Sequence, residues 1–395
     1  MKKNTKQILM VANFSRRGKG PAAYVCDLIN TIAAQAGNGI IIDVLIGAQG
    51  AYIEDGEVNA RKIYKVQPSF FYRILLNLPK VRVVVWRYLK ERLFKKAIGS
   101  SEYDYVVIHS LPSDTLKLVS IAKRSNAKVL LFPWGSEVMR AGNSIKGMLT
   151  KAFNNADYIR GDSDLFIESL LKIYPTIQKD KFVKLTYASP GVSSIERLRG
   201  NKTKEEMLAS LHLPKDRYYI VCGYNAYWGQ QHHKIIESIA KVKEDIPSNY
   251  LLVFPITYGH ESGVGKNDIK VWCDSYGLSY ACLEEYLTDD QMACLHLITD
   301  VFIHMQITDL ANSYIMEAVF ADVKVINGSW LRYSELEQYG IPYHVCKSFE
   351  DLPKILVDVI NGNSVVNVSN QLKSYIHSYS WTSVSKDWIN FIVGN

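Results

Sequence analysis

Two kinds of hydrophobic pattern alternate along the chain. Short, almost continuous apolar runs are typical of buried strands, and longer segments with an apolar residue at every third or fourth position are typical of helices that cover a sheet. In the N-terminal half we predict strands at 6–14, 40–46, 105–109, 129–133 and 158–160, and helices at 21–35 and 113–125. Such alternation indicates a parallel sheet with helices on both of its faces.

The alternation starts again in the C-terminal half of the chain. Here we predict strands at 218–223, 250–255, 279–283, 301–304 and 323–327, and helices at 230–246, 266–276, 288–298, 312–320, 349–361 and from 367 to the end. Between the two series, Pro190, Gly191 and a run rich in Ser, Arg, Asn and Lys interrupt the periodicity. This interruption predicts a linker at 189–203.

The two series predict an α/β protein of two Rossmann-like, doubly wound domains in tandem. We place an N-terminal domain at 1–190 and a C-terminal domain at 204–375, followed by a last segment at 376–395. The length of 395 residues agrees, because about 150 residues per domain predicts two or three domains. Ligands of such sheets bind outside the carboxyl ends of the strands, so we expect a site in a cleft between facing domains.

Composition excludes several classes of protein. Hydrophobic residues make up 48% and charged residues 22% of the chain, which excludes fibrous and low-complexity sequences. The longest apolar runs, at 81–86 and 129–134, are far shorter than the roughly 18–20 residues that span a bilayer. The apolar stretch at 8–14 runs into a basic loop without a cleavage site, which favours a cytoplasmic protein. Six scattered cysteines without a C-x-x-C pair argue against a zinc site or a disulfide framework.

Charge is distributed unevenly along the chain. Residues 1–200 hold 31 Lys and Arg against 16 Asp and Glu, a balance of +15, whereas the remainder holds 15 against 23, a balance of −8. The basic half favours an anionic partner such as nucleic acid, a membrane or a phosphorylated substrate. Within it, residues 73–96 combine eight basic residues and one acid with many apolar ones, which is typical of a segment in a membrane interface. The alternative is a core helix with a solvated basic face.

A basic, glycine-containing loop follows the first predicted strand. Gly18 and Gly20 would let backbone N–H groups approach an anion at a helix N-terminus, and Arg16 and Lys19 add positive charge. The alternative is a plain strand-to-helix turn.

A second polar loop follows the strand predicted at 218–223. Asn225 lies in this loop, and His232 and Lys234 stand where the next helix starts. Small and polar residues there could hold a pyrophosphate, with the histidine or lysine meeting its charge. The alternative is a helix N-terminus with solvated histidines.

The strongest local feature follows the strand predicted at 301–304. Asp309 stands in the loop after this strand, and Glu317 lies eight positions later, inside a helix that Asn312 or Ser313 can cap. This spacing brings Asp309, the N–H groups of the helix N-terminus and Glu317 around one volume. A carboxylate at Glu317 can bind a ribose diol while the helix N-terminus meets a phosphate.

At this point the chain resembles a known family. Asp309, followed by Glu317 and Ala318, is similar to the E-x7-E signature of retaining GT-B glycosyltransferases of the family 4 type, with Asp in place of the first Glu. Gln231, His232 and residues 254–259 resemble the bacterial family that transfers 4-acetamido-4,6-dideoxygalactose. Further segments extend the resemblance over most of the chain: a strand-end histidine at 107–110, a W-G-S-D/E-like loop at 132–137, an interdomain link at 187–192 and an F-S-W-like helix start at 379–382.

The resemblance implies a fold and a donor site. A GT-B chain has two Rossmann-like domains that face each other across a cleft, and its last helix, here 376–395, crosses back to the first domain. The C-terminal domain would bind a nucleotide-sugar, with the ribose on Glu317 and with Asp309 as a catalytic residue. The other residues expected to bind the donor are Gly18, Lys19, Gly20, Asn225, His232, Lys234, Thr257, Tyr258, Gly259, Tyr286, Asn312 and Ser313.

The basic N-terminal domain would bind the acceptor, near Arg16, Trp134 and Ser136. The resemblance favours retention of configuration; an inverting enzyme would need a base, for which His109 and Glu137 are the candidates. No metal or cofactor is implied beyond the nucleotide-sugar itself, because helix N-termini and basic groups stabilise the departing diphosphate. For Trp134 and Glu137 the alternative is a Trp packed under its own loop, with Glu137 capping a helix.

The resulting hypothesis is a hexosyl-type glycosyltransferase on the inner face of the cytoplasmic membrane. It would add a sugar to a lipid-linked saccharide in bacterial cell-surface polysaccharide synthesis and would have no nucleic-acid partner. One alternative is a GT-B epimerase of nucleotide-sugars, which has no need of the basic segment at 73–96. Another is a non-catalytic GT-B-fold partner or glycan-binding subunit, since Asp309 replaces Glu and no Arg and Lys pair follows the second domain's first strand.

Overall fold

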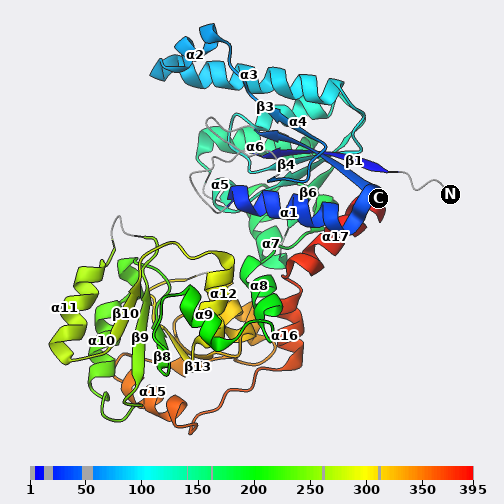
Figure 1. Cartoon of the computed structure of the whole chain (residues 1–395). Coiled ribbons are helices and arrows are strands. Elements are labelled where there is room, and N and C mark those ends of the chain that lie inside the picture. Colours follow the sequence, from blue (N-terminus) through cyan, green and yellow to red (C-terminus); the bar gives the residue numbers. More distant parts are fainter. Residues whose placement is uncertain are drawn as a thin grey trace. The chain divides into compact units, whose positions relative to one another are not determined.

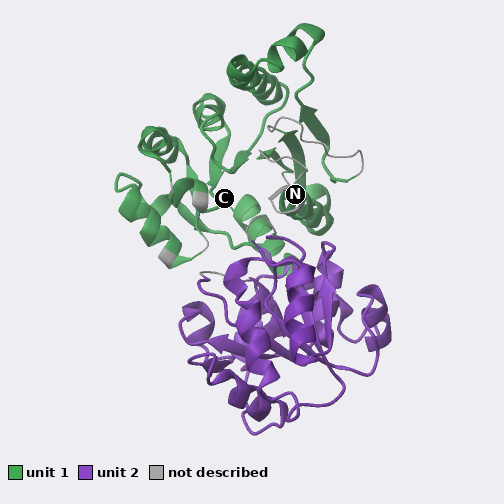
Figure 2. Cartoon of the chain, turned by 90° about the vertical axis from the view of Figure 1, so that its left-hand side faces the viewer, with its two compact units in different colours: residues 1–187, 381–395 green, residues 188–380 purple. Residues whose placement is uncertain are grey.

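A computed structural model describes residues 5–12, 21–46, 57–139, 141–161, 163–259, 263–309 and 313–394 of the chain (Figure 1). The chain divides into two compact units, the first formed by residues 1–187 with 381–395 and the second by residues 188–380 (Figure 2). Each unit is an α/β domain built around a parallel sheet of its own.

Within the described residues, the sheet of the first unit has seven strands in the order β3-β2-β1-β4-β5-β6-β7. The strand order reverses between β1 and β4, as in doubly wound folds. The strands are β1 (Lys6–Ala12), β2 (Ile40–Ile46), β3 (Lys62–Lys65), β4 (Tyr105–His109), β5 (Lys128–Phe132), β6 (Tyr158–Gly161) and β7 (Phe182–Lys184). The helices of this unit are α1 (Pro21–Ala36), α2 (Phe70–Leu76), α3 (Pro79–Gly99), α4 (Leu116–Ala122), α5 (Ser136–Met139), α6 (Asn143–Asn155), α7 (Asp164–Ile173) and α17 (Trp381–Gly394), with short 3-10 helices at Gly37–Gly39 and Lys179–Lys181.

The central strands of this sheet are apolar because helices cover both of their faces. All five residues of β4 are buried, and alternate ones point to opposite sides. Val106 and Ile108 pack in one core with residues of α3, α4 and α6. Tyr105 and His109, on the other face, contact α17, which packs beside α1 although the two helices are far apart in the sequence. The last helix therefore crosses back to the first unit (Figure 1).

The second unit repeats the same topology with one strand fewer among the described residues: β10-β9-β8-β11-β12-β13. Its strands are β8 (Tyr218–Cys222), β9 (Tyr250–Pro255), β10 (Tyr280–Leu283), β11 (Val301–His304), β12 (Lys324–Gly328) and β13 (His344–Cys346). Its helices are α8 (Pro190–Leu198), α9 (Lys204–Ser210), α10 (His232–Ala240), α11 (Lys266–Tyr276), α12 (Asp289–Ile298), α13 (Ser313–Phe320), α14 (Ser334–Glu337), α15 (Leu352–Ile360) and α16 (Asn370–His377), with a 3-10 helix at Trp228–Gln230. Here the order reverses between β8 and β11.

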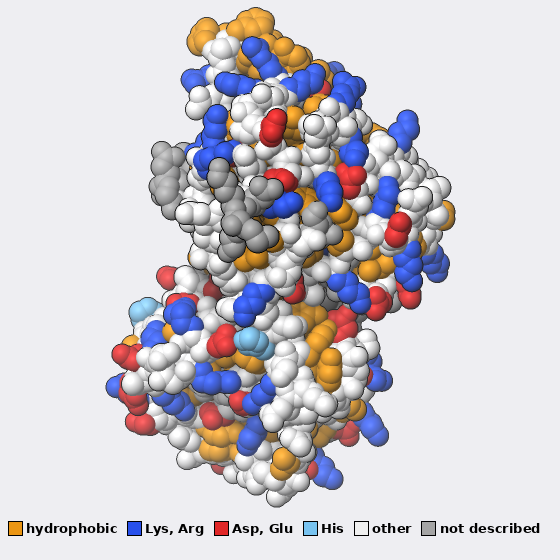
Figure 3. Space-filling model, turned by 90° about the vertical axis from the view of Figure 1, so that its right-hand side faces the viewer, with side chains coloured by type: hydrophobic (Ala, Val, Ile, Leu, Met, Phe, Trp, Pro, Cys, Tyr) orange, Lys and Arg blue, Asp and Glu red, His pale blue; other side chains and the backbone are white. Residues whose placement is uncertain are grey.

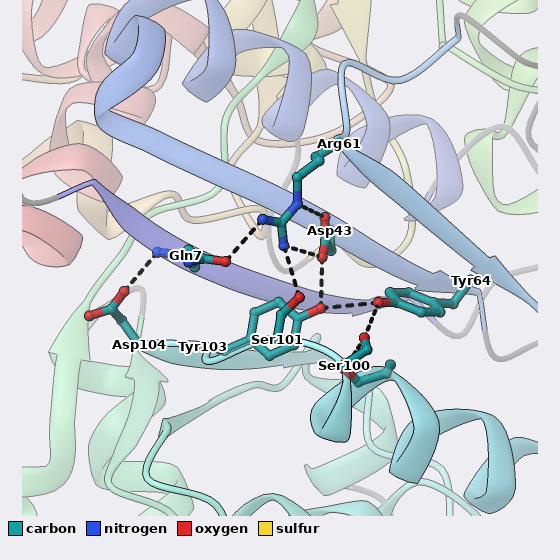
Figure 4. A network of polar contacts seen from close by, with 9 residues as sticks. Gln7, Asp43, Arg61, Tyr64, Ser100, Ser101, Tyr103 and Asp104 are labelled. Carbon is teal, nitrogen blue, oxygen red and sulfur yellow. Dashed lines mark hydrogen bonds and ion pairs between the residues drawn. The ribbon is translucent and has the colours of Figure 1, made fainter.

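A polar network fixes the C-terminal end of α3 to the sheet of the first unit (Figure 4). Asp43 on β2 is fully buried, and Arg61 donates two hydrogen bonds to its carboxylate, at 2.9 and 2.7 Å. The hydroxyl of Tyr103 donates a third, at 2.7 Å. Ser100, which follows α3, lies 2.6 Å from the hydroxyl of Tyr64 on β3. Three hydrogen bonds offset the cost of burying the Asp43 carboxylate, so this network stabilises the C-terminal end of α3.

The other end of α3 and the whole of α2 expose apolar residues. Eight large hydrophobic side chains of this α2–α3 surface are more than a third exposed, and they are Phe70, Phe71, Ile74, Leu78, Val81, Val83, Val84 and Tyr88. Hydrophobic and basic side chains lie side by side at the top of Figure 3. Lys90, by contrast, is buried and forms an ion pair with Asp114 at 2.6 Å, so this member of the basic segment belongs to the core.

Several elements agree closely with the sequence analysis, and others differ. The strands predicted at 40–46, 105–109, 250–255 and 301–304 and the helix at 266–276 have the predicted bounds. The short strands β3, β7 and β13 were not predicted, because each is an edge strand of only three or four residues and lacks a long apolar run. The predicted last helix is two helices, α16 and α17, separated at 378–380.

The expected linker at 189–203 is wrong over most of its length. Pro190 stands at the first turn of α8, where its missing N–H is not needed, and Val192, Ile195 and Leu198 are buried in the core of the second unit. Pro and Gly here start a helix. The remaining polar run ends at Thr203, which caps α9 in a capping box with Glu206.

Candidate functional site

The carboxyl ends of β8 and β11 meet where the strand order of the second unit reverses. In open α/β sheets this is the place where ligands bind. Three loops gather at this edge, one after each of the strands β8, β9 and β11. Most residues of the second unit that were predicted to bind a donor belong to these loops or to the helices that follow, whereas Tyr286 follows β10.

Asp309, in the loop after β11, is held by two side chains. The hydroxyl of Tyr333 donates a hydrogen bond of 3.2 Å to its Oδ2, and Nε2 of His304 lies 3.5 Å from the same oxygen. Burial and the charge of Asp309 raise the pKa of Tyr333, which therefore stays protonated and can donate. Both contacts go to one carboxylate oxygen, so they fix the rotation of the carboxylate.

Glu317, on α13, is buried and has protein partners. Ser189 donates a hydrogen bond of 2.6 Å from its hydroxyl to Oε1, and Nε2 of His296 lies 3.3 Å from Oε2. A Cβ atom at Gly191 would lie 2.2 Å from the Glu317 carboxyl carbon, so only glycine fits there. The carboxylate thus lies against the N-terminus of α8, which favours a negative charge. Its burial needs no ligand to compensate it, although a ribose could share these contacts.

Amide side chains connect the loops after β8 and β11. Nε2 of Gln230 donates to Oε1 of Gln306 at 2.8 Å and to Oδ1 of Asn225 at 3.2 Å. Nε2 of Gln231 donates to the backbone carbonyl of Met305 at 2.7 Å. Asn225, predicted to bind the donor, is buried and also accepts a hydrogen bond from the backbone N–H of Tyr227, so it shapes the loop.

His232 and Lys234 do not bring two positive charges to this site. His232 is fully buried at the start of α10, and burial lowers the pKa of its imidazole to about 4, so it is neutral at neutral pH. The alternative of solvated histidines is wrong for His232 as well. Lys234 is exposed, and its ammonium donates to Oε1 of Gln231 at 3.0 Å.

Residues 257–259 form the loop after β9, which packs against the loop after β8. The backbone N–H of Ala226 donates to the carbonyl of Tyr258 at 2.8 Å. Gly259 has a φ of +90°, which glycine adopts without strain, and a Cβ atom there would lie 3.0 Å from the Tyr227 nitrogen. Thr257 is half-buried and Tyr258 is exposed.

Tyr286 and Ser313 are also exposed, Ser313 at the first residue of α13. Asn312 lies outside the described residues.

The strand-end histidine of the first unit has different surroundings. His109 is fully buried, and its ring lies 4.6 Å from Phe132 and 6.2 Å from Trp388 of α17. Burial and, to a lesser extent, the positive charge of Arg160 lower its pKa to about 3. A buried neutral imidazole under aromatic rings has no exposed surface with which to meet an acceptor hydroxyl. The structure therefore gives His109 a packing role instead of the expected role as a base.

Trp134 and Glu137 adopt the alternative arrangement named above, in which the Trp packs within its own domain and Glu137 caps a helix. Oε1 of Glu137 accepts a hydrogen bond of 2.7 Å from the backbone N–H of Trp134, so it caps the start of α5. The indole of Trp134 packs edge-on against Tyr24 at 5.2 Å and Tyr187 at 4.9 Å. Arg16, Gly18, Lys19 and Gly20 lie outside the described residues, as does the side chain of Ser136.

Comparison with known proteins rests on structure alone. No protein-family model and no curated protein sequence matches the chain. A glycosyltransferase from Rickettsia africae matches with a TM-score of 0.68 and 16% identity, over 98% of each chain. UDP-GlcNAc 2-epimerase from Neisseria meningitidis bound to UDP-GlcNAc matches with a TM-score of 0.66 and 13% identity, over 98% of this chain and 100% of that one. HepE from Anabaena in complex with UDP matches with a TM-score of 0.61 and 13% identity, over 99% of this chain and 100% of that one.

The chain has the GT-B fold. Each unit has one point at which the strand order reverses, at β1/β4 in the first unit and at β8/β11 in the second. Among the described residues no helix is long and apolar enough to cross a bilayer. Nor does the described part of the chain group three His, Cys, Asp or Glu side chains as a metal ion would require.

Several polar residues at the carboxyl edge of the second GT-B sheet were not singled out from the sequence. They are Ser189, Gln306, His296, His304, Asn327 and Tyr333. One signal was available for His304: the strands Tyr105–His109 and Val301–His304 both end in a histidine after an apolar run. The others come from segments far apart in the sequence, so no local pattern connects them.

Proposed function

We propose that the protein is a glycosyltransferase that takes its sugar from a nucleotide-sugar. The observation that carries this proposal is the pair of carboxylates, Asp309 and Glu317, each held by protein donors at the edge of the second sheet where the strand order reverses. The likeness to HepE in complex with UDP and to an epimerase bound to UDP-GlcNAc supports a nucleotide-sugar as the ligand.

Each carboxylate has a proposed task. Glu317 would accept hydrogen bonds from the ribose diol, with Ser189 and His296 keeping its carboxylate in place. Asp309 would face the transferred sugar, where a fixed carboxylate can orient hydroxyl groups and stabilise the positive charge that develops at the anomeric carbon. The N-terminus of α13 would lie towards the diphosphate. These roles fit a metal-independent reaction with retention of configuration.

The proposed acceptor is a lipid-linked saccharide at an anionic membrane surface, as in bacterial cell-surface polysaccharide synthesis. The α2–α3 surface supports this part of the proposal. Phe70 and Phe71 are 79% and 64% exposed, and Arg73, Lys80 and Arg82 are exposed beside them. Apolar side chains next to cations favour the interface of an anionic leaflet. The protein would then be peripheral on the cytoplasmic face of the membrane.

A nucleotide-sugar epimerase is the second candidate, because an epimerase structure matches nearly the whole chain with a TM-score of 0.66. An epimerase changes its nucleotide-sugar without an acceptor and has no use for an apolar, basic surface. An assay without the acceptor therefore distinguishes the two functions.

The test uses the full chain and a panel of UDP-, GDP- and dTDP-sugars. We expect one nucleotide family to raise the melting temperature, and release of the nucleoside diphosphate to require a lipid-linked acceptor. Conversion of the sugar without an acceptor would identify an epimerase. Binding without turnover under any condition would favour a non-catalytic glycan-binding subunit, and the absence of any binding would contradict the proposal.

Membrane contact has its own test, by sedimentation with phosphatidylglycerol vesicles. Replacing Arg73, Lys80 and Arg82 with Gln should weaken binding by about 1 kcal/mol each at low salt. A matched control replaces Lys215, Arg217 and Lys241, exposed cations of the second unit, with Gln. Equal sedimentation of wild type and the triple variant would contradict a membrane role of the α2–α3 surface.

A further inference from the structure

A buried polar chain ends at Asp309. It starts at Asn327 on β12, continues through His304 at the end of β11 and reaches the carboxylate in the loop that follows. His304 is fully buried, with the rings of Phe302, Tyr224 and Tyr333 at centroid distances of 5.7, 5.8 and 6.3 Å. Nothing in the sequence assigned it a role.

The orientation of Asn327 determines which nitrogen of His304 carries a proton. Nδ2 of Asn327 donates to two backbone carbonyls, those of Gly328 at 3.2 Å and Leu331 at 2.9 Å. An amide nitrogen is needed to meet two carbonyls, so Oδ1 is the atom that lies 2.9 Å from Nδ1 of His304. Since Oδ1 can only accept, Nδ1 of His304 must carry a hydrogen.

The second nitrogen of His304 then faces a carboxylate. In a neutral ring with its hydrogen on Nδ1, Nε2 presents a lone pair to Oδ2 of Asp309 at 3.5 Å. The Nε2 lone pair and the carboxylate oxygen would then both be hydrogen-bond acceptors, and two buried acceptors that face each other repel. A second proton on Nε2 turns the same geometry into a charge-assisted contact.

The other groups around His304 do not supply this charge balance. Burial and the charge of Asp309 raise the pKa of both Tyr224 and Tyr333, so these phenols are neutral at neutral pH. Tyr333 already donates its hydrogen to Asp309. Among the described neighbours of His304 named above, Asp309 is the one with a carboxyl group.

We propose that His304 is a positioning residue: a doubly protonated imidazole, oriented by Asn327, that holds the Asp309 carboxylate in the geometry needed to meet the donor sugar. The inference about the sugar rests on the proposed function. The inference about the protonation of His304 rests on the hydrogen-bond geometry alone. His304 acts through Asp309 and does not itself touch a substrate.

The protonation state has a direct spectroscopic readout. In protein with ¹⁵N-labelled histidine, we expect the signals of both His304 nitrogens to be those of protonated nitrogens at pH 7, with the assignment taken from the His304→Asn variant. In Asp309→Asn the second proton should be lost. A wild-type spectrum with an unprotonated Nε2 would overturn the proposal, whether or not the protein is a transferase.

Two substitutions of His304 separate its two contacts. His304→Gln places an amide nitrogen near the position of Nε2 and keeps a donor towards Asp309, whereas His304→Asn places one near Nδ1 and keeps only the contact with Asn327. We expect His304→Asn to lower kcat/KM at least 30-fold and His304→Gln to recover most of it. Both should melt cooperatively. Equal losses in the two variants would show that the ring fills space and does not orient Asp309.

A double-mutant cycle distinguishes positioning from simple stabilisation. If His304 acts through Asp309, His304→Asn should change nucleotide-sugar turnover less than threefold in an Asp309→Asn background. The same loss in both backgrounds would overturn the proposal. If the wild type itself neither binds nor turns over a nucleotide-sugar, the proposed function fails, while the nitrogen signals still decide the protonation of His304.

Discussion

The two sheets end their equivalent strands with the same residue and use it differently. β4 and β11 lie next to the first strand of their respective sheets, and both end in histidine, His109 and His304. The residue in register on the next strand is Phe132 beside His109 and Asn327 beside His304. An aromatic neighbour and the helix α17 make His109 part of a core, whereas an amide neighbour and a carboxylate make His304 part of a polar chain. The partner on the adjacent strand therefore determines what a strand-end histidine can do.

The two histidines also have charged neighbours of opposite sign. Arg160, a buried cation on β6, stacks on Phe132 and Tyr187 and disfavours a proton on His109. Beside His304, by contrast, the Asp309 carboxylate lies 3.5 Å from Nε2. We thus expect chemistry at the strand ends of the second unit, and packing at this strand end of the first.

The largest effect should come from removing the charge of Asp309. Asp309→Asn keeps the shape of the side chain but cannot balance an imidazolium or a developing positive charge. We expect transfer to fall about 100-fold or more, equivalent to about 2.7 kcal/mol. Initial rates of nucleoside diphosphate release measure this. A variant with wild-type rates would remove Asp309 from the mechanism and with it the contrast between the two histidines.

A steric test addresses the Glu317 site. Gly191→Ala places a methyl group on the Glu317 carboxyl group, so we expect the free energy of unfolding to fall by about 1–3 kcal/mol and nucleotide binding to weaken. Gly147, within α6 of the first unit, is the matched control because a Cβ atom there meets nothing within 4 Å. Gly147→Ala should stabilise by up to about 1 kcal/mol. Similar denaturation midpoints for the two variants would contradict the packing of α8 on Glu317.

The pH dependence of stability probes His109. Its pKa of about 3 in the folded chain lies below the ordinary value of about 6.5, so between these pH values the unfolded chain binds the extra proton. His109 therefore leaves the free energy of unfolding nearly unchanged above pH 6.5. Below pH 6.5 it lowers this free energy by about 1.4 kcal/mol per pH unit. His109→Leu should remove about 2 kcal/mol of the loss between pH 6.5 and 5. Urea titrations at both pH values measure the difference, and parallel losses in wild type and variant would place His109 in contact with water.

The smallest effect is expected at Glu137. Glu137→Gln leaves an oxygen that can still accept from the Trp134 backbone N–H, so turnover should change less than threefold and stability by less than about 1 kcal/mol. Steady-state kinetics with saturating donor measure this. A loss of about 100-fold would restore Glu137 as the acid or base and would move chemistry into the first unit.

Local patterns predicted most of the fold. The central strands are continuous apolar runs buried on both faces, and the helix predicted from residue 288 is α12, which Thr288 caps. The edge strands β3 and β13 have fewer buried residues, so their short runs carry little signal. The linker predicted at Pro190 and Gly191 was wrong because the same residues that break a periodic pattern also start α8 and leave room for the Glu317 carboxylate.

The candidate site was predictable only where its residues are close in the sequence. Asp309 and Glu317 are eight positions apart and were singled out together, whereas Ser189 reaches Glu317 across 128 positions and Tyr333 reaches Asp309 across 24. The burial of His109 depends on Trp388, which the returning helix brings to β4 from the far end of the chain. Such contacts are set by tertiary structure, and no periodicity of a single segment contains them.

The central claim is that the second unit binds a nucleotide-sugar through Glu317, while the strand-end histidine of the first unit is structural. Calorimetric titration of the best nucleotide-sugar from the panel into wild type, Glu317→Gln and His109→Leu tests both parts at once. We predict saturable binding by wild type, a dissociation constant at least tenfold higher for Glu317→Gln, and a value within twofold of wild type for His109→Leu. Unchanged affinity in Glu317→Gln, or a loss confined to His109→Leu, would contradict the account.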